Sequence, residues 1–221
     1  MNIKNSLFID KLDKLIQQKH MITHPFYQAW NCGVLTKTTL QSYAKEYYQH
    51  VKAFPTYISA LHSRCDDLEI RRCLLINLID EESGYPNHPD LWKSFALAIG
   101  VDQNELDIHK PEAMTKELIN HFRNNCRDQS LAIGIAVLYS YESQIPVICQ
   151  TKIDGLKKWY GLQDSESYRY FSVHETADVE HSDAEKKMLL SMIQPGEEEM
   201  ILEAVDTTLN ALGNFLDSFC V

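Results

Sequence analysis

The segment from Ser130 to about Lys152 is apolar on nearly every side when it is drawn as a helix, and Glu142 stands inside it. A helix without a polar face is buried among other helices. Apolar residues also recur at spacings of three and four through most of the chain, while alternation with a period of two is almost absent. The sequence therefore predicts an all-α bundle with this segment at its centre.

The composition is that of one helical domain. Only 8 of the 221 residues are glycine and 7 are proline, so turn-forming residues are scarce. No repeat, low-complexity tract or linker interrupts the chain. We therefore expect residues 1–221 to form a single all-α domain, long enough to bury a large core.

Capping residues, glycines and prolines predict where individual helices begin and end. In the helix expected from Asp66 or Asp67 to Gly84, the residues predicted to face the core are Leu68, Cys73, Leu75 and Leu78. The expected helices are residues 6–19, residues 25–30, a long helix capped by Thr38 or Thr39 and kinked at Pro55, a helix from Asp66 or Asp67 to Gly84, a helix from about Asn87 to Gly100, a helix beginning at Pro111, and then residues 130–152, 165–180, 182–193 and 197–219.

Charge and cysteine usage exclude some classes of function. Asp and Glu outnumber Lys and Arg 31 to 21, which argues against a nucleic-acid partner because phosphate backbones require basic surfaces. The 6 cysteines form no C-x-x-C pair and suit the reduced thiols of a cytosol. The start of the chain lacks a secretory h-region, and the longest apolar run, Leu131–Tyr141, is shorter than the ~20 residues of a membrane span. We expect a soluble, cytoplasmic protein with no membrane partner.

The most specific local pattern is His174, Asp178 and His181, spaced by four and three residues on a predicted helix. On an ideal helix these three side chains share one stripe about two turns long. Two imidazoles and a carboxylate on one stripe are typical of a metal site. The alternative is an exposed polar stripe of the kind that many surface helices carry.

Glu142 adds a second element, because a carboxylate in an apolar helix must be protonated, paired or bound to a cation. A buried salt bridge, or a hydrogen bond from Tyr139 or Tyr141, would also satisfy it. Glu142 is therefore expected to have a proton, a hydrogen-bond donor or a cation beside it, but the sequence does not show which of these it has.

Glu81 and His88 form a third element, although Gly84 and Pro86 interrupt the helix that would align them. Taken alone, this run is a charged helix end followed by a capping Asn87. Taken together, the three elements offer three carboxylates and three imidazoles. That mixture suits two iron or manganese ions better than a structural zinc ion, which favours thiolates.

The order Glu-x6-His, a lone buried Glu, and His-x3-Asp-x2-His resembles the haem-oxygenase-like dimetal oxidase superfamily. The thiaminase-like and pyrroloquinoline-quinone-synthase-like bundles are relatives in this superfamily. The resemblance is strongest to the branch of the chlamydial protein associating with death domains, and it includes the run Thr23-His24-Pro25-Phe26-Tyr27. It implies a seven-helix bundle in which Glu81, His88, Glu142, His174, Asp178 and His181 hold two metal ions, Fe/Fe or Mn/Fe.

The resemblance also implies a reaction: synthesis of 4-aminobenzoate for folate from the protein's own side chains, with O2 and an external reductant. Tyr27 would supply the ring and Lys152 the amino nitrogen, with Tyr43 as a second aromatic residue near the site. From the residues alone, Tyr27 is equally a core tyrosine. Lys152 is equally a helix-end cation, about 15 Å along an ideal helix from Glu142 and about 80° off its stripe.

Two rival functions remain open. A metal-free thiaminase-like hydrolase would use a cysteine nucleophile with a glutamate, and Cys149 lies seven residues after Glu142. An interaction protein would bind host death-domain proteins through its acidic surface. The resemblance further implies a homodimer in a bacterial cytoplasm, while export to a host cell cannot be read from the sequence.

Overall fold

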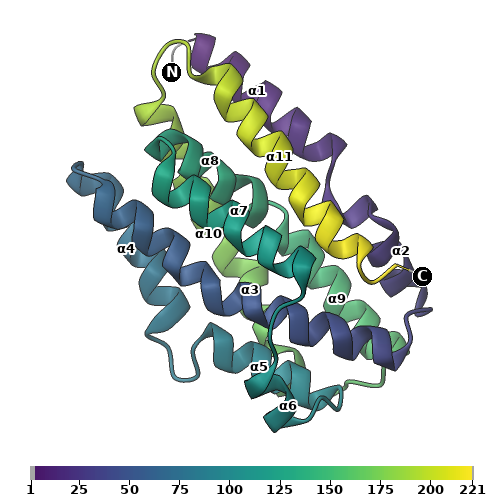
Figure 1. The fold of residues 1–221 in the computed structure, drawn as a ribbon. Helices are drawn as coiled ribbons and strands as arrows, with labels where there is room; N and C mark the ends of the chain where they lie inside the picture. Colours follow the sequence, from purple (N-terminus) through teal and green to yellow (C-terminus); the bar gives the residue numbers. More distant parts are fainter. Residues whose placement is uncertain (1–2, 221) are drawn as a thin grey trace.

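The computed structural model describes residues 3–220, and every regular element in that range is a helix. Figure 1 shows the long helices packed side by side in one bundle. This confirms the all-α prediction, but the described residues form eleven α-helices rather than the seven that the resemblance implies. The α-helices are α1 (Ile3–Gln18), α2 (Pro25–Cys32), α3 (Lys37–Arg64), α4 (Leu68–Glu82), α5 (His88–Ala98), α6 (Gln103–Ile108), α7 (Ala113–Asp128), α8 (Leu131–Glu142), α9 (Ile145–Trp159), α10 (Arg169–Met192) and α11 (Glu198–Asp217), and the 3-10 helices are η1 (Met21–Thr23) and η2 (Ser165–Tyr168).

Helix α8 lies at the centre of the bundle, as its apolar sequence predicts. Every residue from Ala132 to Glu142 is buried, and the helix packs against α3, α7, α10 and α11. The Ser130 side chain begins the helix by accepting a hydrogen bond from the Ile133 N–H.

The central segment is not the single helix that was predicted, because a turn at Ser143 and Gln144 separates α8 from α9. The Gln144 side chain stabilises this turn. It accepts a hydrogen bond from the Met21 N–H at 2.8 Å and donates one to the Ser140 carbonyl at 2.5 Å. The turn changes the direction in which the residues of α9 point, so the ideal-helix angle between Glu142 and Lys152 does not apply.

Helix α10 is one continuous element, although the sequence predicted two helices with a break near Ser182. The Ser182 hydroxyl donates a hydrogen bond to the Asp178 carbonyl at 2.6 Å, within the same helix. A serine that bonds the preceding turn does not cap a new helix. The residues on both sides of Ser182 therefore share one helical register.

Other helix boundaries differ from the sequence predictions by a few residues. Asp67 and Asn87 cap α4 and α5 as expected, whereas Thr36, rather than Thr38 or Thr39, caps α3. Pro55 lies inside α3, which continues for nine further residues.

The region between α5 and α7 departs further from the prediction. Helix α7 begins at Ala113 rather than Pro111, and the short α6 was not predicted. Helix α6 has 6 residues, of which Leu106 is buried. One buried residue in so short a segment gives no repeat of apolar residues from which a helix could be predicted.

The predicted core face of α4 is wrong. Leu68 and Leu75 are exposed, and Cys73 and Leu78 are only partly buried. Ile70, Leu74, Asn77 and Glu81 are buried instead, so two polar side chains take positions that face the bundle. Hydrophobic burial alone does not favour that orientation, which points to another role for Asn77 and Glu81.

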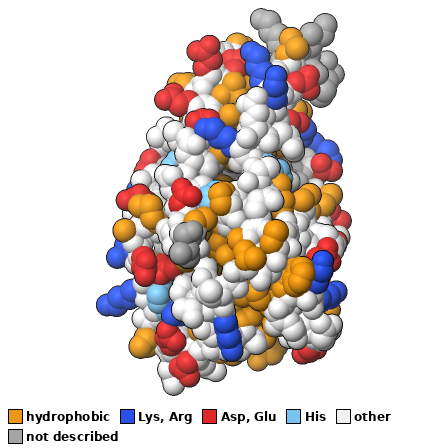
Figure 2. All heavy atoms as spheres, turned by 90° about the vertical axis from the view of Figure 1, so that its right-hand side faces the viewer, with side chains coloured by type: hydrophobic (Ala, Val, Ile, Leu, Met, Phe, Trp, Pro, Cys, Tyr) orange, Lys and Arg blue, Asp and Glu red, His pale blue; other side chains and the backbone are white. Residues whose placement is uncertain are grey.

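The apolar stretch is longer than the sequence suggested, because α8 and α9 together run from Leu131 to Trp159 with only a short turn between them. Its length and composition would suffice to cross a membrane, but 78% of its apolar window is buried inside the protein. Packing in the bundle core accounts for this apolar character. On the surface shown in Figure 2, acidic and basic side chains are intermixed with apolar ones.

Close helix packing at Gly155 gives a test of the fold. A Cβ atom at this position would lie 2.5 Å from Cδ1 of Trp30, whose Nε1 donates a hydrogen bond to the Lys152 carbonyl at 3.3 Å. We expect Gly155→Ala to lower the free energy of unfolding by about 1–2 kcal/mol, because overpacking outweighs the gain in helix propensity.

Gly213→Ala is the matched control, since Gly213 lies inside α11 and nothing lies within 4 Å of the position of an added Cβ. This substitution should raise the free energy of unfolding by about 0.5–1 kcal/mol. Denaturant unfolding measures both values. Equal effects of the two substitutions would contradict the packing of α2 against α9.

Candidate metal centre

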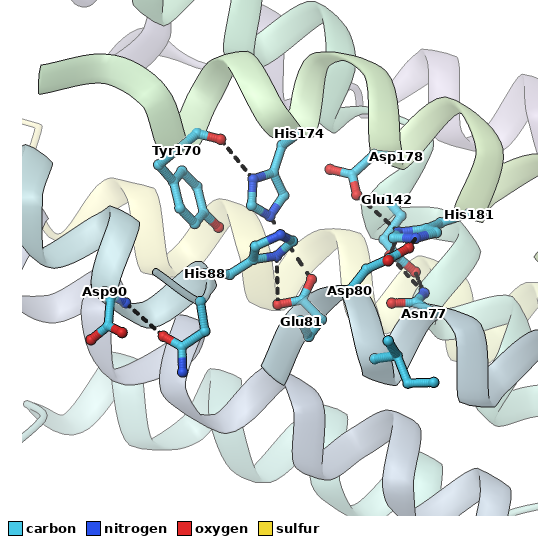
Figure 3. Close-up of polar contacts among 12 residues, drawn as sticks. Asn77, Asp80, Glu81, His88, Asp90, Glu142, Tyr170, His174, Asp178 and His181 are labelled. Atoms are coloured by element: carbon cyan, nitrogen blue, oxygen red, sulfur yellow. Dashed lines mark hydrogen bonds and ion pairs between the residues drawn. The ribbon is translucent and has the colours of Figure 1, made fainter. Parts of the chain in front are cut away.

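The six side chains predicted to bind metal lie on α4, α5, α8 and α10. They point toward one another inside the bundle (Figure 3). Helix α10 supplies three of them, and α4, α5 and α8 supply one each. All six are at most 5% exposed, so the alternative of a solvent-exposed polar stripe is wrong. The six residues are Glu81, His88, Glu142, His174, Asp178 and His181.

The first cluster consists of Glu81, His88 and His174, with one ligand atom of each within 4.8 Å of the others. His88 Nδ1 lies 3.0 Å from one Glu81 oxygen, and His174 Nε2 lies 3.9 Å from the other. His174 Nδ1 donates a hydrogen bond to the Tyr170 carbonyl at 2.7 Å, which turns its Nε2 lone pair toward the cluster. A backbone acceptor of this kind orients histidines that bind metals.

The second cluster consists of Glu142, Asp178 and His181, again within 4.8 Å of one another. His181 Nδ1 lies 3.4 Å from Glu142 Oε1 and 3.6 Å from Asp178 Oδ1. Its Nε2 donates to Asp80 at 3.0 Å, so Nδ1 faces the two carboxylates.

Asn77 is the hydrogen-bond donor to Glu142, from Nδ2 to Oε1 at 3.1 Å. The tyrosines considered from the sequence bind elsewhere: the Tyr139 hydroxyl donates to Asp13 at 2.6 Å, and that of Tyr141 bonds to the Tyr47 hydroxyl. The buried side of α4 therefore serves the site through Asn77 as well as Glu81.

Burial and charge act in opposition at both clusters. Burial would raise the pKa of Glu81, but His174 and His88 lower that pKa to about 2. Burial would lower the pKa of His181, yet Asp178 and Glu142 raise it to about 11. Burial, supported by the nearby Glu142, raises the pKa of Asp178 to about 6. The second cluster thus holds more acidic groups than its one imidazole neutralises.

The donor set fits a pair of metal ions. Among the described residues, Asp178 Oδ2 is buried without a hydrogen-bond partner, and Nδ1 of His88 and Nδ1 of His181 have ion-pair contacts with carboxylates but no hydrogen bond, although buried polar atoms are normally satisfied. Mixed carboxylate and imidazole donors suit iron and manganese, and none of the six is a thiolate. The assignment of each residue as a ligand stays a prediction.

A separate buried group contains the residues predicted to react. Tyr27 and Tyr43 are fully or almost fully buried, and Lys152 is 2% exposed. Lys152 Nζ donates a hydrogen bond to the Tyr43 hydroxyl at 2.7 Å and lies 5.4 Å from the centre of the Tyr27 ring. The Tyr43 hydroxyl in turn interacts with that of Tyr27. The structure therefore brings together all three residues that the resemblance names.

Lys152 is enclosed by aromatic rings rather than by carboxylates. Within the described part of the chain no ion pair reaches its ammonium group, and burial lowers its pKa to about 7. A substantial fraction of this amine is therefore neutral near pH 7, which makes it a competent nucleophile. The rings within 6 Å of Nζ belong to Tyr27, Trp30, Tyr43, Tyr47, Trp92 and Phe171.

Further tyrosines, which the sequence analysis did not place in the site, lie between this group and the metal-binding side chains. The rings of Tyr43 and Tyr47 are 5.3 Å apart, and Tyr47 bonds to Tyr141. Tyr141 and Tyr170 line a small cavity with Glu81, Glu142, His174 and Asp178. The four-residue spacing of Tyr43 and Tyr47 on one helix was a signal for this arrangement.

Cys149 does not have the environment that a cysteine nucleophile needs. Burial raises the pKa of its thiol well above the ordinary value, and the charged groups acting on it are Lys152, Asp178 and Glu175. A thiol with a raised pKa forms little thiolate near neutral pH. The turn after α8 also removes the helical alignment with Glu142 on which the hypothesis rested.

Residues 9–220 match the TENA/THI-4/PQQC family, so the chain belongs to this family. Over 212 residues it is 52% identical to the 4-aminobenzoate synthase of Chlamydia muridarum (strain MoPn / Nigg), covering 96% of this chain and 89% of that protein. It is also 42% identical over 220 residues to the 4-aminobenzoate synthase of Nitrosomonas europaea, covering 95% and 89%.

Solved structures confirm the haem-oxygenase-like fold. A Shewanella denitrificans domain described as having a heme oxygenase-like fold matches with a TM-score of 0.80 at 17% identity, over 97% of this chain and 90% of that one.

The environment of Lys152 predicts a pH dependence of stability. Because its pKa is about 7 in the folded chain and 10.5 as its ordinary value, the unfolded chain binds more protons between these values. The contribution of Lys152 to stability therefore rises with pH over this range, by up to about 1.4 kcal/mol per pH unit. Lys152→Met should remove this rise.

Denaturant unfolding at pH 7, 8.5 and 10 measures the difference between Lys152→Met and the unmodified protein. The variant should be relatively most stable at pH 7 and lose that advantage as the pH increases. Lys158→Met, at an exposed position of the same helix, is the control. Its free energy of unfolding should change with pH in the same way as that of the unmodified protein. A parallel course for Lys152→Met would show that Lys152 has an ordinary pKa.

Proposed function

We propose that this protein is an O2-dependent dimetal oxidase that makes 4-aminobenzoate from its own side chains. The observation that carries the proposal is the buried group of Lys152, Tyr43 and Tyr27, connected through Tyr47 and Tyr141 to the cavity between the metal-binding residues. The relatives named 4-aminobenzoate synthase, 42% and 52% identical over nearly the whole chain, support it.

The carbon skeleton of the product matches that of a tyrosine side chain. 4-Aminobenzoate is a six-membered ring with one carbon attached and a nitrogen opposite it. A tyrosine side chain beyond Cα is the same ring with one carbon attached and an oxygen opposite it. Tyr27 would thus provide all seven carbons if the bond between its Cα and Cβ were broken, Cβ were oxidised to the carboxylate with O2 as the oxidant, and the phenol oxygen were replaced by nitrogen.

Lys152 is placed to supply that nitrogen. Its Nζ lies 5.4 Å from the centre of the Tyr27 ring, and its lowered pKa leaves a free electron pair on the amine near neutral pH. Tyr43 accepts the hydrogen bond from Nζ and faces the Tyr27 hydroxyl, so it holds both reacting groups in position. Fixed proximity of this kind raises the effective concentration of one group toward the other.

A bound iron or manganese pair, held by the six side chains of the two clusters, would supply the O2-dependent oxidation. Other residues of the chain orient the metal-binding histidines and exclude water. His174 and His181 are oriented by the Tyr170 carbonyl and by Asp80, and the bundle excludes water from the buried tyrosines. Burial raises the pKa of the Tyr27 phenol, so it stays protonated until a proton and an electron leave it together.

The rival functions lack comparable support. A thiol enzyme would leave the two buried clusters without a role and would depend on Cys149, whose pKa is raised. The homodimer, the binding of host death-domain proteins and the cytoplasmic location stay predictions, as do the identity of each metal ion and of the reductant.

Mass spectrometry of the intact protein tests the proposal. Protein loaded with Fe²⁺ or with Mn²⁺ and Fe²⁺, then given a reductant and O2, should release 4-aminobenzoate once per chain. Peptide mapping should find the ring missing at Tyr27 and a changed side chain at Lys152. His174→Ala, Tyr27→Phe and Lys152→Met should each reduce product to background.

Tyr57→Phe is the matched control for the loss of a buried phenol. Tyr57 is fully buried on α3, and its hydroxyl has no hydrogen-bond partner among the described residues. This variant should form product at the level of the unmodified protein. Undiminished product from Tyr27→Phe, or an unchanged residue 27 after turnover, would overturn the assignment of the ring donor.

A further inference from the structure

Glu185, on α10, is a buried acidic residue that the proposed metal centre has not used. Its side chain is 1% exposed. Among the described residues, no hydrogen-bond donor reaches either of its oxygens. A buried carboxylate without a partner costs several kcal/mol, so its presence calls for an explanation.

Glu185 lies on the same face of α10 as Asp178 and His181 of the second cluster. Asp178, His181 and Glu185 are spaced by three and four residues in one continuous helix. On an ideal helix they lie within an arc of about 60°, so Glu185 continues the ligand stripe by one further turn.

The carboxyl groups of Glu185 and Glu142 interact with each other, and Asn77 of α4 donates a hydrogen bond to Glu142. The other acidic group acting on Glu185 is Asp178. Three buried carboxyl groups therefore lie close together, and the one imidazole beside them, that of His181, contacts Glu142 and Asp178. Such an arrangement is repulsive unless a proton or a cation neutralises part of its charge.

The first cluster has no such excess, because Glu81 lies between the two imidazoles of His88 and His174. The two clusters therefore differ in their donors. The first cluster has one carboxylate and two imidazoles, whereas the second has two carboxylates and one imidazole, with Glu185 beside them. Oxygen-rich sites of high negative charge favour hard divalent ions such as Mn²⁺.

We propose that Glu185 is a positioning residue of the dimetal centre: it orients Glu142 and adds a third carboxylate to the cation position of Glu142, Asp178 and His181. This role rests on the proposed metal centre. A structural role alone does not account for the side chain, since a buried carboxylate without donors is replaced by an apolar residue of similar volume with little loss or with a gain in stability.

Equilibrium dialysis of the full-length protein against increasing MnCl2, with bound metal measured by mass spectrometry, tests this role. The unmodified protein should bind two equivalents. Glu185→Gln and Glu185→Met should bind the first equivalent normally and the second at least about tenfold more weakly, as expected for a residue that orients a ligand. Glu180→Gln removes an exposed carboxylate from the same helix and should match the unmodified protein.

Thermal unfolding of the metal-free proteins supplies a second measurement. Glu185→Gln and Glu185→Met should unfold at the same temperature as the unmodified protein or at a higher one, because the contact between carboxylates is gone. Affinity for the second equivalent within twofold of the unmodified protein, or lower unfolding temperatures for both metal-free variants, would overturn the inference. Fewer than two equivalents bound by the unmodified protein would instead overturn the proposed dimetal centre.

Discussion

The cost of removing acidic side chains from water is the constraint on which this structure depends. Glu81, Glu142, Asp178 and Glu185 are buried in a bundle whose central helix is apolar on all sides. Apolar packing alone would expel such groups, since transfer of an unpaired carboxylate to a protein interior is strongly unfavourable. The three histidines offset part of this cost, and divalent cations would offset the rest. Metal binding at the proposed centre would therefore be coupled to folding.

The same low-dielectric interior acts in the opposite sense on Lys152. An ammonium group surrounded by six aromatic rings and paired with a phenol loses most of its hydration, and its pKa falls. The bundle core thus contains both the buried carboxylates and the weakly basic amine of Lys152, with Tyr47 and Tyr141 between them. Direct contact with these carboxylates would raise the pKa of Lys152 and keep its amine protonated.

Sequence periodicity predicted the parts of the site that lie within single helices. His174, Asp178 and His181 follow from the 3.6-residue repeat, and Glu142 from its isolation in an apolar segment. The position of Lys152 was not predicted, because the break between α8 and α9 was missed. Pro146, in the first turn of α9, lacks the N–H that would continue α8, and the hydrogen bond from Met21 to Gln144 fixes the turn. Glu185 was missed because Ser182 was interpreted as the start of a new helix. The orientation of α4 is likewise set by tertiary contacts.

The burial of Tyr27 has a consequence for the protein after one reaction cycle. Under the proposed function, loss of this ring would leave a hollow beside Phe26 and Tyr43 in the buried core. Removal of a buried aromatic side chain typically costs about 3–5 kcal/mol, a large share of the roughly 5–15 kcal/mol that holds a domain folded. A spent chain would open more often than a fresh one and be degraded first by cellular proteases.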